Sequence, residues 1–212
     1  MQTYSACGAA MSCQQCPKAV GNAIIYASHS RGFHLPAQKC EENIMIFLLK
    51  GEVLVNSQHE HDVMNELAKR GYEGVGVDVE EMDITDAAAV DSVIREAKVD
   101  SVVHCAAWTA VDAAEDNEEM CRKVNAEGTE NIAKVCKALD IPMIYISTDY
   151  VFEGEGTRPW EPDDKVTQPL NIYGQTKYEG EQAVERLLDK YYIVRIAWVF
   201  GVNGKNFIKT ML

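Results

Sequence analysis

The chain has 212 residues, of which 47% are hydrophobic and 25% charged, as is typical of a globular protein with a buried core. Its 20 Lys and Arg stand against 33 Asp and Glu, for a formal net charge of −13, and this acidity disfavours a nucleic-acid partner. No window approaches about 18 consecutive apolar residues, so we expect no membrane span.

The first 43 residues are rich in Ala, Ser, Gln and Cys and show no sustained apolar period, so we expect an atypical leader over residues 1–43. The sequence leaves open whether this leader is ordered or disordered. It lacks the basic segment followed by an apolar one that marks a secretory signal. Cys13-x-x-Cys16, with Cys7 and Cys40, superficially resembles a metal site, but no second pair completes it, so we expect free thiols and no metal.

The number of cysteines is odd, seven in all, and three of them lie in apolar segments. These three are Cys105, Cys121 and Cys136. Buried free thiols in a cytoplasmic protein explain them better than a disulfide scaffold does.

From residue 44 onward, short apolar runs alternate with longer amphipathic ones. The predicted strands cover residues 44–49, 74–78, 99–107, 142–148 and 191–200. The predicted helices cover residues 61–71, 86–97, 116–139 and 173–188. This alternation predicts a doubly wound, parallel α/β sheet of the Rossmann type, covered on both faces. The Gly-, Pro- and acid-rich residues 153–169 are predicted to form a long loop, and loops of this length are usually functional or mobile.

Ligand sites of open α/β sheets lie beyond the carboxyl ends of the strands, where this sequence places polar residues. Thr148 ends one predicted strand, and Tyr173 and Lys177 lie one turn apart on the next helix. A phenol, with a pKa of about 10, is a poor acid or base at neutral pH until a cation stabilises its phenolate. We therefore predict that Lys177 is this cation and that the Thr148 hydroxyl holds the reacting oxygen.

Five blocks in order resemble the dTDP-4-dehydrorhamnose reductase family of the extended short-chain dehydrogenase/reductase superfamily. They are CAAWTAVDAAE, VNAEGTENIA, ISTDYVFEG, PLNIYGQTKYEGE and RIAWVFG. The resemblance extends over residues 61–212. It implies a Rossmann-type domain over residues 44–212 that includes the start of a substrate domain, with NADPH or NADH as cofactor. It also implies a dTDP-sugar substrate, reduced at C4 to give dTDP-L-rhamnose, and leaves the oligomeric state open, with a homodimer as one alternative.

The resemblance assigns roles to individual residues. It implies that Tyr173 protonates the C4 oxygen as general acid, that Lys177 bonds the nicotinamide ribose and lowers the pKa of Tyr173, and that Thr148 hydrogen-bonds the substrate. Asp149 and Trp198 match positions that contact the sugar nucleotide. The cofactor contacts it implies are Ser57, Gln58, Asp78, Asp83, Ile84, Ala107, Trp108 and Thr109, with Asp78 suited to a ribose 2′-OH.

Several of these assignments have a purely structural alternative. Tyr173 and Lys177 could be a surface pair on a helix, and Asp78 could be a turn residue. Trp198 could belong to the core. Thr109 and Asp112 could cap a helix instead of contacting a ligand.

The sequence departs from the family where its first strand leads into a glycine-rich turn, TGxNGQLG, which lets the backbone approach the pyrophosphate. Residues 53–60 occupy this stretch, and Leu54, Ser57 and Glu60 replace its three glycines. Taking Gly51 as the first glycine restores only that one. Because Glu60 places a carboxylate near two phosphates, we expect weakened dinucleotide binding. We also expect that most of the sugar-nucleotide domain is missing after Leu212, as in a fragment or a frameshifted product.

Three hypotheses about function follow. The leading one is an NAD(P)H-dependent reductase of dTDP-4-dehydro-L-rhamnose. The alternative is a catalytically inactive Rossmann module that acts as a regulatory or binding subunit. The third, an epimerase or dehydratase of nucleotide sugars, shares the YxxxK motif but is disfavoured by the ISTDYVF and AWTAVD blocks.

Overall fold

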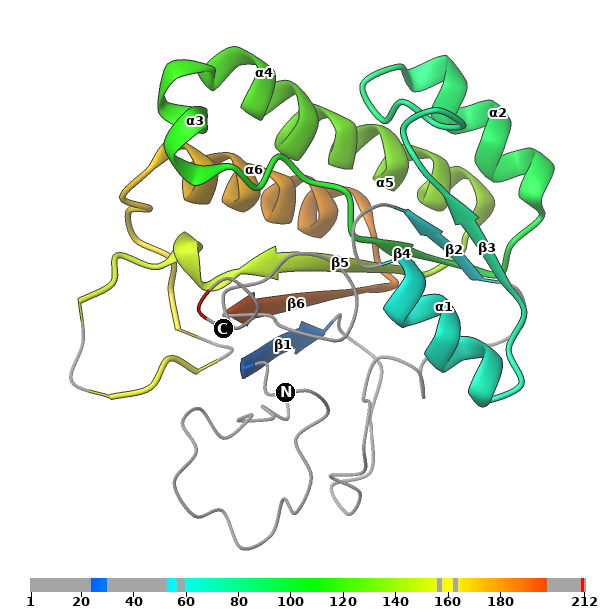
Figure 1. Cartoon of the computed structure of the whole chain (residues 1–212), viewed down its shortest axis with the longest axis horizontal. Helices are drawn as coiled ribbons and strands as arrows, with labels where there is room; N and C mark the ends of the chain where they lie inside the picture. Colours follow the sequence, from blue (N-terminus) through cyan, green and yellow to red (C-terminus); the bar gives the residue numbers. More distant parts are fainter. Residues whose placement is uncertain are drawn as a thin grey trace, which may run out of the picture.

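The computed structural model describes residues 24–29, 53–56, 60–155, 158–161, 164–197 and 211, with side chains from residue 63 on. Within these ranges the chain forms a six-stranded sheet with helices on its faces (Figure 1). No helix of the described ranges has the length and apolar character needed to cross a membrane.

The elements alternate between strand and helix along most of the chain. The strands are β1 (Ile24–His29), β2 (Val53–Asn56), β3 (Gly74–Val77), β4 (Ser101–His104), β5 (Met143–Thr148) and β6 (Tyr191–Ala197). The helices are α1 (Glu60–Lys69), α2 (Ala87–Ala97), α3 (Val111–Asp116), α4 (Glu118–Arg122), α5 (Thr129–Leu139) and α6 (Ile172–Leu187). A π-helical segment, η2 (Lys123–Gly128), joins α4 to α5, and a 3-10 turn, η3 (Asp149–Val151), follows β5.

The strand order is β1-β6-β5-β4-β2-β3, and β2 to β6 run parallel. The chain thus moves outward from β2 to β3 and then crosses over to β4, β5 and β6, which confirms the predicted doubly wound α/β sheet. The predicted elements from residue 61 on match the observed ones within a few residues, except that β4 is shorter and the predicted helix 116–139 contains η2.

Two features at the start of the described chain were not anticipated from the sequence. The predicted leader contains β1, which pairs antiparallel with β6, so the sheet is mixed at this edge. An edge strand is held by backbone hydrogen bonds and needs no apolar period of its own. Residues 53–56, aligned above with the glycine turn, form β2 between β3 and β4. The predicted strand 44–49 lies outside the described residues, and the boundary between leader and domain remains a prediction.

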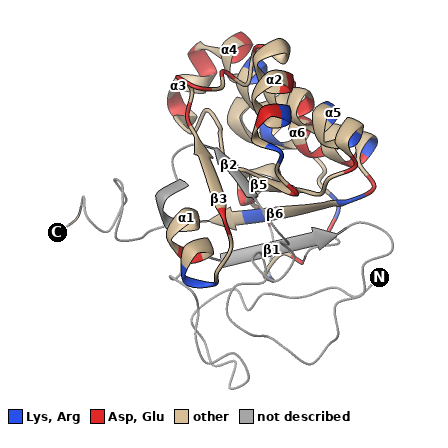
Figure 2. Cartoon of the chain, turned by 90° about the vertical axis from the view of Figure 1, so that its right-hand side faces the viewer, with Lys and Arg blue, Asp and Glu red and all other residues tan. Residues whose placement is uncertain are grey.

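The core forms two layers because alternate residues of each strand face opposite sides of the sheet. One layer packs α2, α5 and α6 onto the sheet, and includes Val102, Tyr145 and Ile193. The other packs α1 through Leu67 onto Val103. Figure 2 shows acidic residues (red) along α3 and α4.

The first turn of α6 lies very close to the segment after β5. Asn171 caps the helix by accepting a hydrogen bond from the Gly174 N–H at 2.7 Å. A Cβ on Gly174 would overlap the backbone carbonyl of Tyr150. Only glycine therefore lets the start of α6 approach the end of β5 this closely.

We predict that Gly174→Ala destabilises the protein by about 1–3 kcal/mol, because overpacking against backbone forces the helix outward. Gln175→Ala is the matched control, since residue 175 is exposed on the same turn, and its effect should stay within about 0.5 kcal/mol. Urea unfolding measures both. Equal stability of the two variants would contradict the close approach of the helix to Tyr150.

Candidate active site at the carboxyl end of β5

Thr148 and Tyr173 meet where β5 ends and α6 begins. Thr148 is buried, and its Oγ1 accepts a hydrogen bond from the Tyr150 N–H at 3.2 Å. Burial raises the pKa of Tyr173 to about 12, although a side-chain hydrogen bond with Thr148 opposes this shift. The phenol is therefore a proton donor at neutral pH, beside a hydroxyl that can share a ligand oxygen.

Lys177 lies one turn further along α6 and is almost completely buried, at 1% exposure. Its Nζ donates a hydrogen bond to the carbonyl of Ile146 at 2.8 Å and lies 4.1 Å from the centre of the Tyr145 ring. Burial lowers the pKa of Lys177 to about 7, and the charge of Glu181 opposes this shift. This burial excludes the alternative that Tyr173 and Lys177 form a surface pair.

In this structure burial raises the pKa of Tyr173, whereas Lys177 is predicted to lower it. The pKa of Tyr173 responds to burial, Thr148, Asp149, Tyr150 and Cys121. Lowering of the phenol pKa by Lys177 stays a prediction for the ligand-bound protein.

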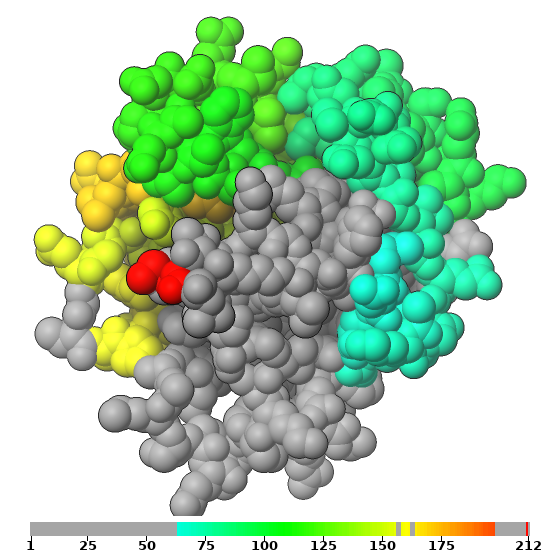
Figure 3. Space-filling view, in the orientation of Figure 1, coloured from blue at the N-terminus to red at the C-terminus, as the bar shows by residue number. Residues whose placement is uncertain are grey.

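Asp149 and Tyr150, which follow Thr148 in the chain, both interact with Tyr173. Asp149 is half-buried, which raises the pKa of its carboxyl, and its Oδ1 accepts a hydrogen bond from the Thr148 hydroxyl at 3.3 Å. The Tyr150 ring is 46% exposed and packs edge-on against Tyr173, with ring centres 5.6 Å apart. In the space-filling view the segment after β5 (yellow) lies at the surface beside α6 (orange) and α3–α4 (green) (Figure 3). Sequence reasoning named Asp149 but missed Tyr150.

Asn125, in the π-helical segment, was also missed although it lies in a quoted block. Its buried side chain accepts a hydrogen bond from the Trp108 N–H at 2.8 Å and donates to the Trp108 carbonyl at 3.2 Å. It also donates to Thr176 Oγ1 at 3.1 Å. Asn125 thus joins the loop after β4 to the first turns of α6. π-Helical turns occur often at functional sites because they turn a side chain inward.

The residues predicted to contact the cofactor follow the carboxyl ends of β3 and β4. Asp78 is exposed, and its Oδ1 accepts a hydrogen bond from the Val79 N–H at 2.7 Å, as in a turn. Asp83 accepts two hydrogen bonds from Thr85, whereas the side chain of Ile84 is buried in the core. The loop after β4 includes Ala107, Trp108 and Thr109, with Thr109 exposed.

The structure decides one alternative for the predicted residues and does not describe three other predicted residues. The helix-capping alternative for Thr109 and Asp112 is wrong, because α3 begins after Ala110 without a side-chain cap. Ser57, Gln58 and Trp198 lie outside the described residues.

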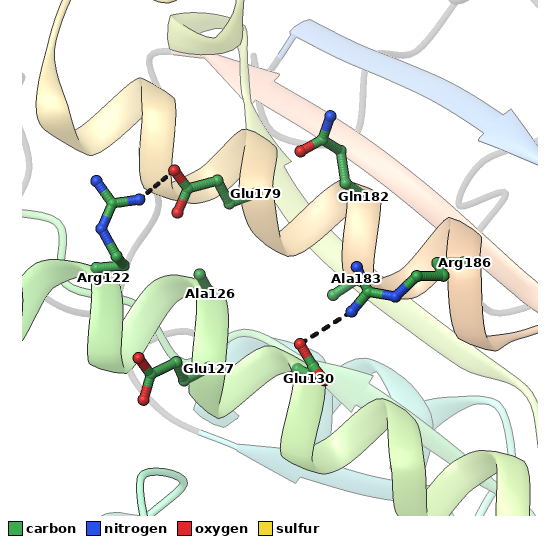
Figure 4. Close-up of a pocket in the computed structure, with 8 residues that line it drawn as sticks. All are labelled: Arg122, Ala126, Glu127, Glu130, Glu179, Gln182, Ala183 and Arg186. Atoms are coloured by element: carbon green, nitrogen blue, oxygen red, sulfur yellow. Dashed lines mark hydrogen bonds and ion pairs between the residues drawn. The ribbon is translucent and has the colours of Figure 1, made fainter.

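A surface hollow lies between the π-helical segment, α5 and α6 (Figure 4). Its two ends are closed by the ion pairs Arg122–Glu179 and Arg186–Glu130. Its lining does not include Thr148, Tyr173 or Lys177. No group of three or more His, Cys, Asp or Glu side chains gathers in a metal-binding arrangement within the described ranges.

The parallel sheet, with Thr148, Tyr173 and Lys177 at its carboxyl edge, defines a Rossmann-type α/β protein. A model of the family described as RmlD substrate binding domain matches residues 51–212. The chain belongs to this family.

Several relatives carry the name dTDP-4-dehydrorhamnose reductase. The Streptomyces griseus enzyme is 48% identical over 132 residues, covering 62% of this chain and 43% of the relative. The Mycolicibacterium smegmatis enzyme is 45% identical over 149 residues, covering 69% and 45%. The chain therefore spans about half the length of the curated relatives it matches.

Solved structures agree with this assignment. The dTDP-4-dehydrorhamnose reductase of Clostridium acetobutylicum superposes with a TM-score of 0.72 at 40% identity, covering 76% of this chain and 57% of that one. The Bacillus anthracis enzyme, solved in complex with NADP, has a TM-score of 0.69 at 36% identity, with coverage of 77% and 59%.

We predict that Asn125→Ala lowers the free energy of unfolding by about 2–4 kcal/mol, because it leaves several buried partners of the amide unpaired. Asn117→Ala, which removes one exposed hydrogen bond to Ala113, should cost less than about 1 kcal/mol. Hydrogen exchange should show loss of protection at the Trp108 amide only in Asn125→Ala. Unchanged protection there would contradict the bridging role of Asn125.

We predict that the free energy of unfolding falls as the pH rises from 9.0 towards 12. Burial raises the pKa values of Cys105 and Cys136 from 9.0 to about 12, so the unfolded chain loses these protons first. Each thiol contributes a slope of about 1.4 kcal/mol per pH unit. Lys177, whose pKa is lowered to about 7, has the opposite effect up to its ordinary value of 10.5.

Cys136→Ala should make the fall of the unfolding free energy with pH shallower by the contribution of one thiol, about 1.4 kcal/mol per pH unit. Urea unfolding at several pH values would measure this. A variant with the same slope as the parent protein would mean that Cys136 titrates normally.

Proposed function

We propose that this chain contributes to the NAD(P)H-dependent reduction of dTDP-4-dehydro-L-rhamnose to dTDP-L-rhamnose. The single observation that carries the proposal is the contact between Thr148 and Tyr173 at the carboxyl end of β5, one helical turn from the buried Lys177. The names of the relatives, and the NADP in the Bacillus anthracis structure, support the reaction and the cofactor.

In this proposal Tyr173 donates the proton that converts the C4 carbonyl to an alcohol. A bound reduced nicotinamide supplies the hydride to the C4 carbon. With a pKa of about 12, Tyr173 holds its proton at neutral pH until negative charge develops on the C4 oxygen. Thr148 hydrogen-bonds that oxygen, and the Lys177 cation stabilises the phenolate left behind. Asp149 and Trp198 are assigned to the sugar nucleotide.

The cofactor assignments fit the residues after β3 and β4 better than those after β2. Asp78 has an exposed carboxylate at the end of β3 that can accept a ribose hydroxyl. Asp83, Ile84, Ala107, Trp108 and Thr109 would flank the cofactor, with Ile84 contributing backbone only. The connection from β2 to α1, which includes Ser57 and Gln58, contains no glycine. We therefore propose weaker binding of NADPH or NADH than a glycine-rich turn would give.

We propose a cytoplasmic location for this protein. The buried, free thiols of Cys121 and Cys136 support it, because reduced cysteines persist in that compartment.

We predict that the purified chain binds NAD(P)H, measured by calorimetry, and reduces dTDP-4-dehydrorhamnose. Tyr173→Phe should lower kcat by about 10²–10⁴, because it removes the proton donor. Tyr178→Phe is the matched control on the same helix and should stay within about twofold. Absence of both binding and turnover in folded protein would refute the reductase proposal and favour a binding module.

A further inference from the structure

Three polar side chains of α6, spaced four residues apart, meet three consecutive residues of β5. The spacing places them on one face of the helix, directed at the strand. The contacts are those of Tyr173 with Thr148, of Lys177 Nζ with the Ile146 carbonyl at 2.8 Å, and of Glu181 Oε1 with Ser147 Oγ at 2.5 Å. The third contact has no role in the proposed reaction as described so far.

Glu181 is buried, at 1% exposure, and forms a two-pronged ion pair with Arg195 of β6. Arg195 Nε lies 2.9 Å from Glu181 Oε1, and Arg195 Nη2 lies 2.6 Å from Oε2. The guanidinium also lies 5.0 Å above the ring of Phe152, which stacks on Trp160. Glu181 thus connects α6 to β5 and β6 at the strand positions that lead to Thr148.

A buried ion pair of this kind is weak evidence for a role in stability. Taking two charges out of water costs several kcal/mol, and apolar residues of equal volume often replace such pairs without loss. The position of Glu181, one turn from Lys177, suggests a different reason for the charge.

The surroundings of Lys177 contain few groups that could balance its charge. His104 is fully buried, and burial keeps its pKa well below the usual value, so the ring is neutral. Cys105 and Cys121 have raised pKa values and are neutral thiols at neutral pH. Tyr145 presents the face of its ring. The carboxylate of Glu181 is the main group that favours the charged form of Lys177.

We propose that Glu181 is a positioning residue for the reductase site, which favours the charged form of the buried Lys177 and fixes Ser147, next to Thr148, against α6. Arg195 holds the carboxylate in place and links it through Phe152 to the loop after β5. This inference rests on the proposed function, because Lys177 serves the reaction only in its charged form.

The test compares Glu181→Gln with Glu179→Gln in the 212-residue protein. Glutamine keeps the shape of the side chain and removes its charge. Glu179 is a matched control on the same helix, since it pairs with Arg122 at the surface hollow instead of facing Lys177. Glu181→Gln leaves the buried Arg195 without its hydrogen-bonded carboxylate and could prevent folding, so Glu181→Gln/Arg195→Gln is made as well.

The first readout needs no turnover. NMR of ¹³C-labelled lysine, with Lys177 assigned through Lys177→Arg, follows the titration of its side chain. In folded Glu181→Gln, or in the double variant, the ratio of charged to neutral Lys177 at a given pH should fall about tenfold. Glu179→Gln should change it less than twofold. An unchanged titration of Lys177 in folded protein without the Glu181 charge would overturn the proposal.

The second readout is the pH profile of dTDP-4-dehydrorhamnose reduction. Activity should decline with rising pH as Lys177 loses its proton. In Glu181→Gln this decline should occur at a pH about one unit lower, which is a tenfold higher proton concentration. The kcat at the low-pH plateau should be retained. A merely structural role would lower the plateau without moving the decline. If the parent protein shows no turnover while its Lys177 titration responds to Glu181, the reductase proposal fails and the placement of Glu181 stands.

Discussion

The close docking of α6 onto the carboxyl half of β5 is the constraint on which the candidate site depends. Gly174 allows the first turn of the helix to approach the Tyr150 carbonyl, and Gly180 allows the third turn to approach the Tyr145 hydroxyl and the Asn125 carbonyl. At this separation a lysine ammonium reaches a backbone carbonyl of the strand directly. A helix held one side-chain layer further away would leave Lys177 in solvent, with an ordinary pKa and no contact to the end of the strand.

Much of the fold follows from local pattern in the sequence. The alternation of apolar runs and amphipathic segments predicted every described helix and strand from residue 60 on except α3, because burial of one helix face or of a whole strand imposes a period. The i, i+4 spacing of Tyr173 and Lys177 placed them correctly on one helix. The strand β1 and the helical break at Asn117 have no such period, and β2 was misplaced because its sequence had been aligned with a turn.

The parts of the site that escaped prediction are those that only tertiary structure brings together. Glu181 and Arg195 lie in quoted sequence blocks, but nothing local indicates that an acid on α6 and a base on β6 will share a buried ion pair. Asn125 looks like an ordinary polar residue in a helix until the π-helical segment turns it towards Trp108. The residues proposed for the reaction differ from those proposed for the cofactor. The residues around Tyr173 are connected by many buried contacts, whereas the connection from β2 to α1 contains no glycine.

The π-helical segment between α4 and α5 carries one residue more than regular helical winding would need. Each residue of an α-helix advances the winding by about 100°. Shortening Lys123–Gly128 by a single residue would therefore restore a regular helix and rotate its two ends relative to each other by about that angle. Either Asn125 would leave the Trp108 backbone, or the buried face of α5 with Ile132 and Cys136 would leave the core. The length of this short segment is thus fixed by two partners at once, so deletion of one residue should be far more damaging than substitution of an exposed residue such as Glu127.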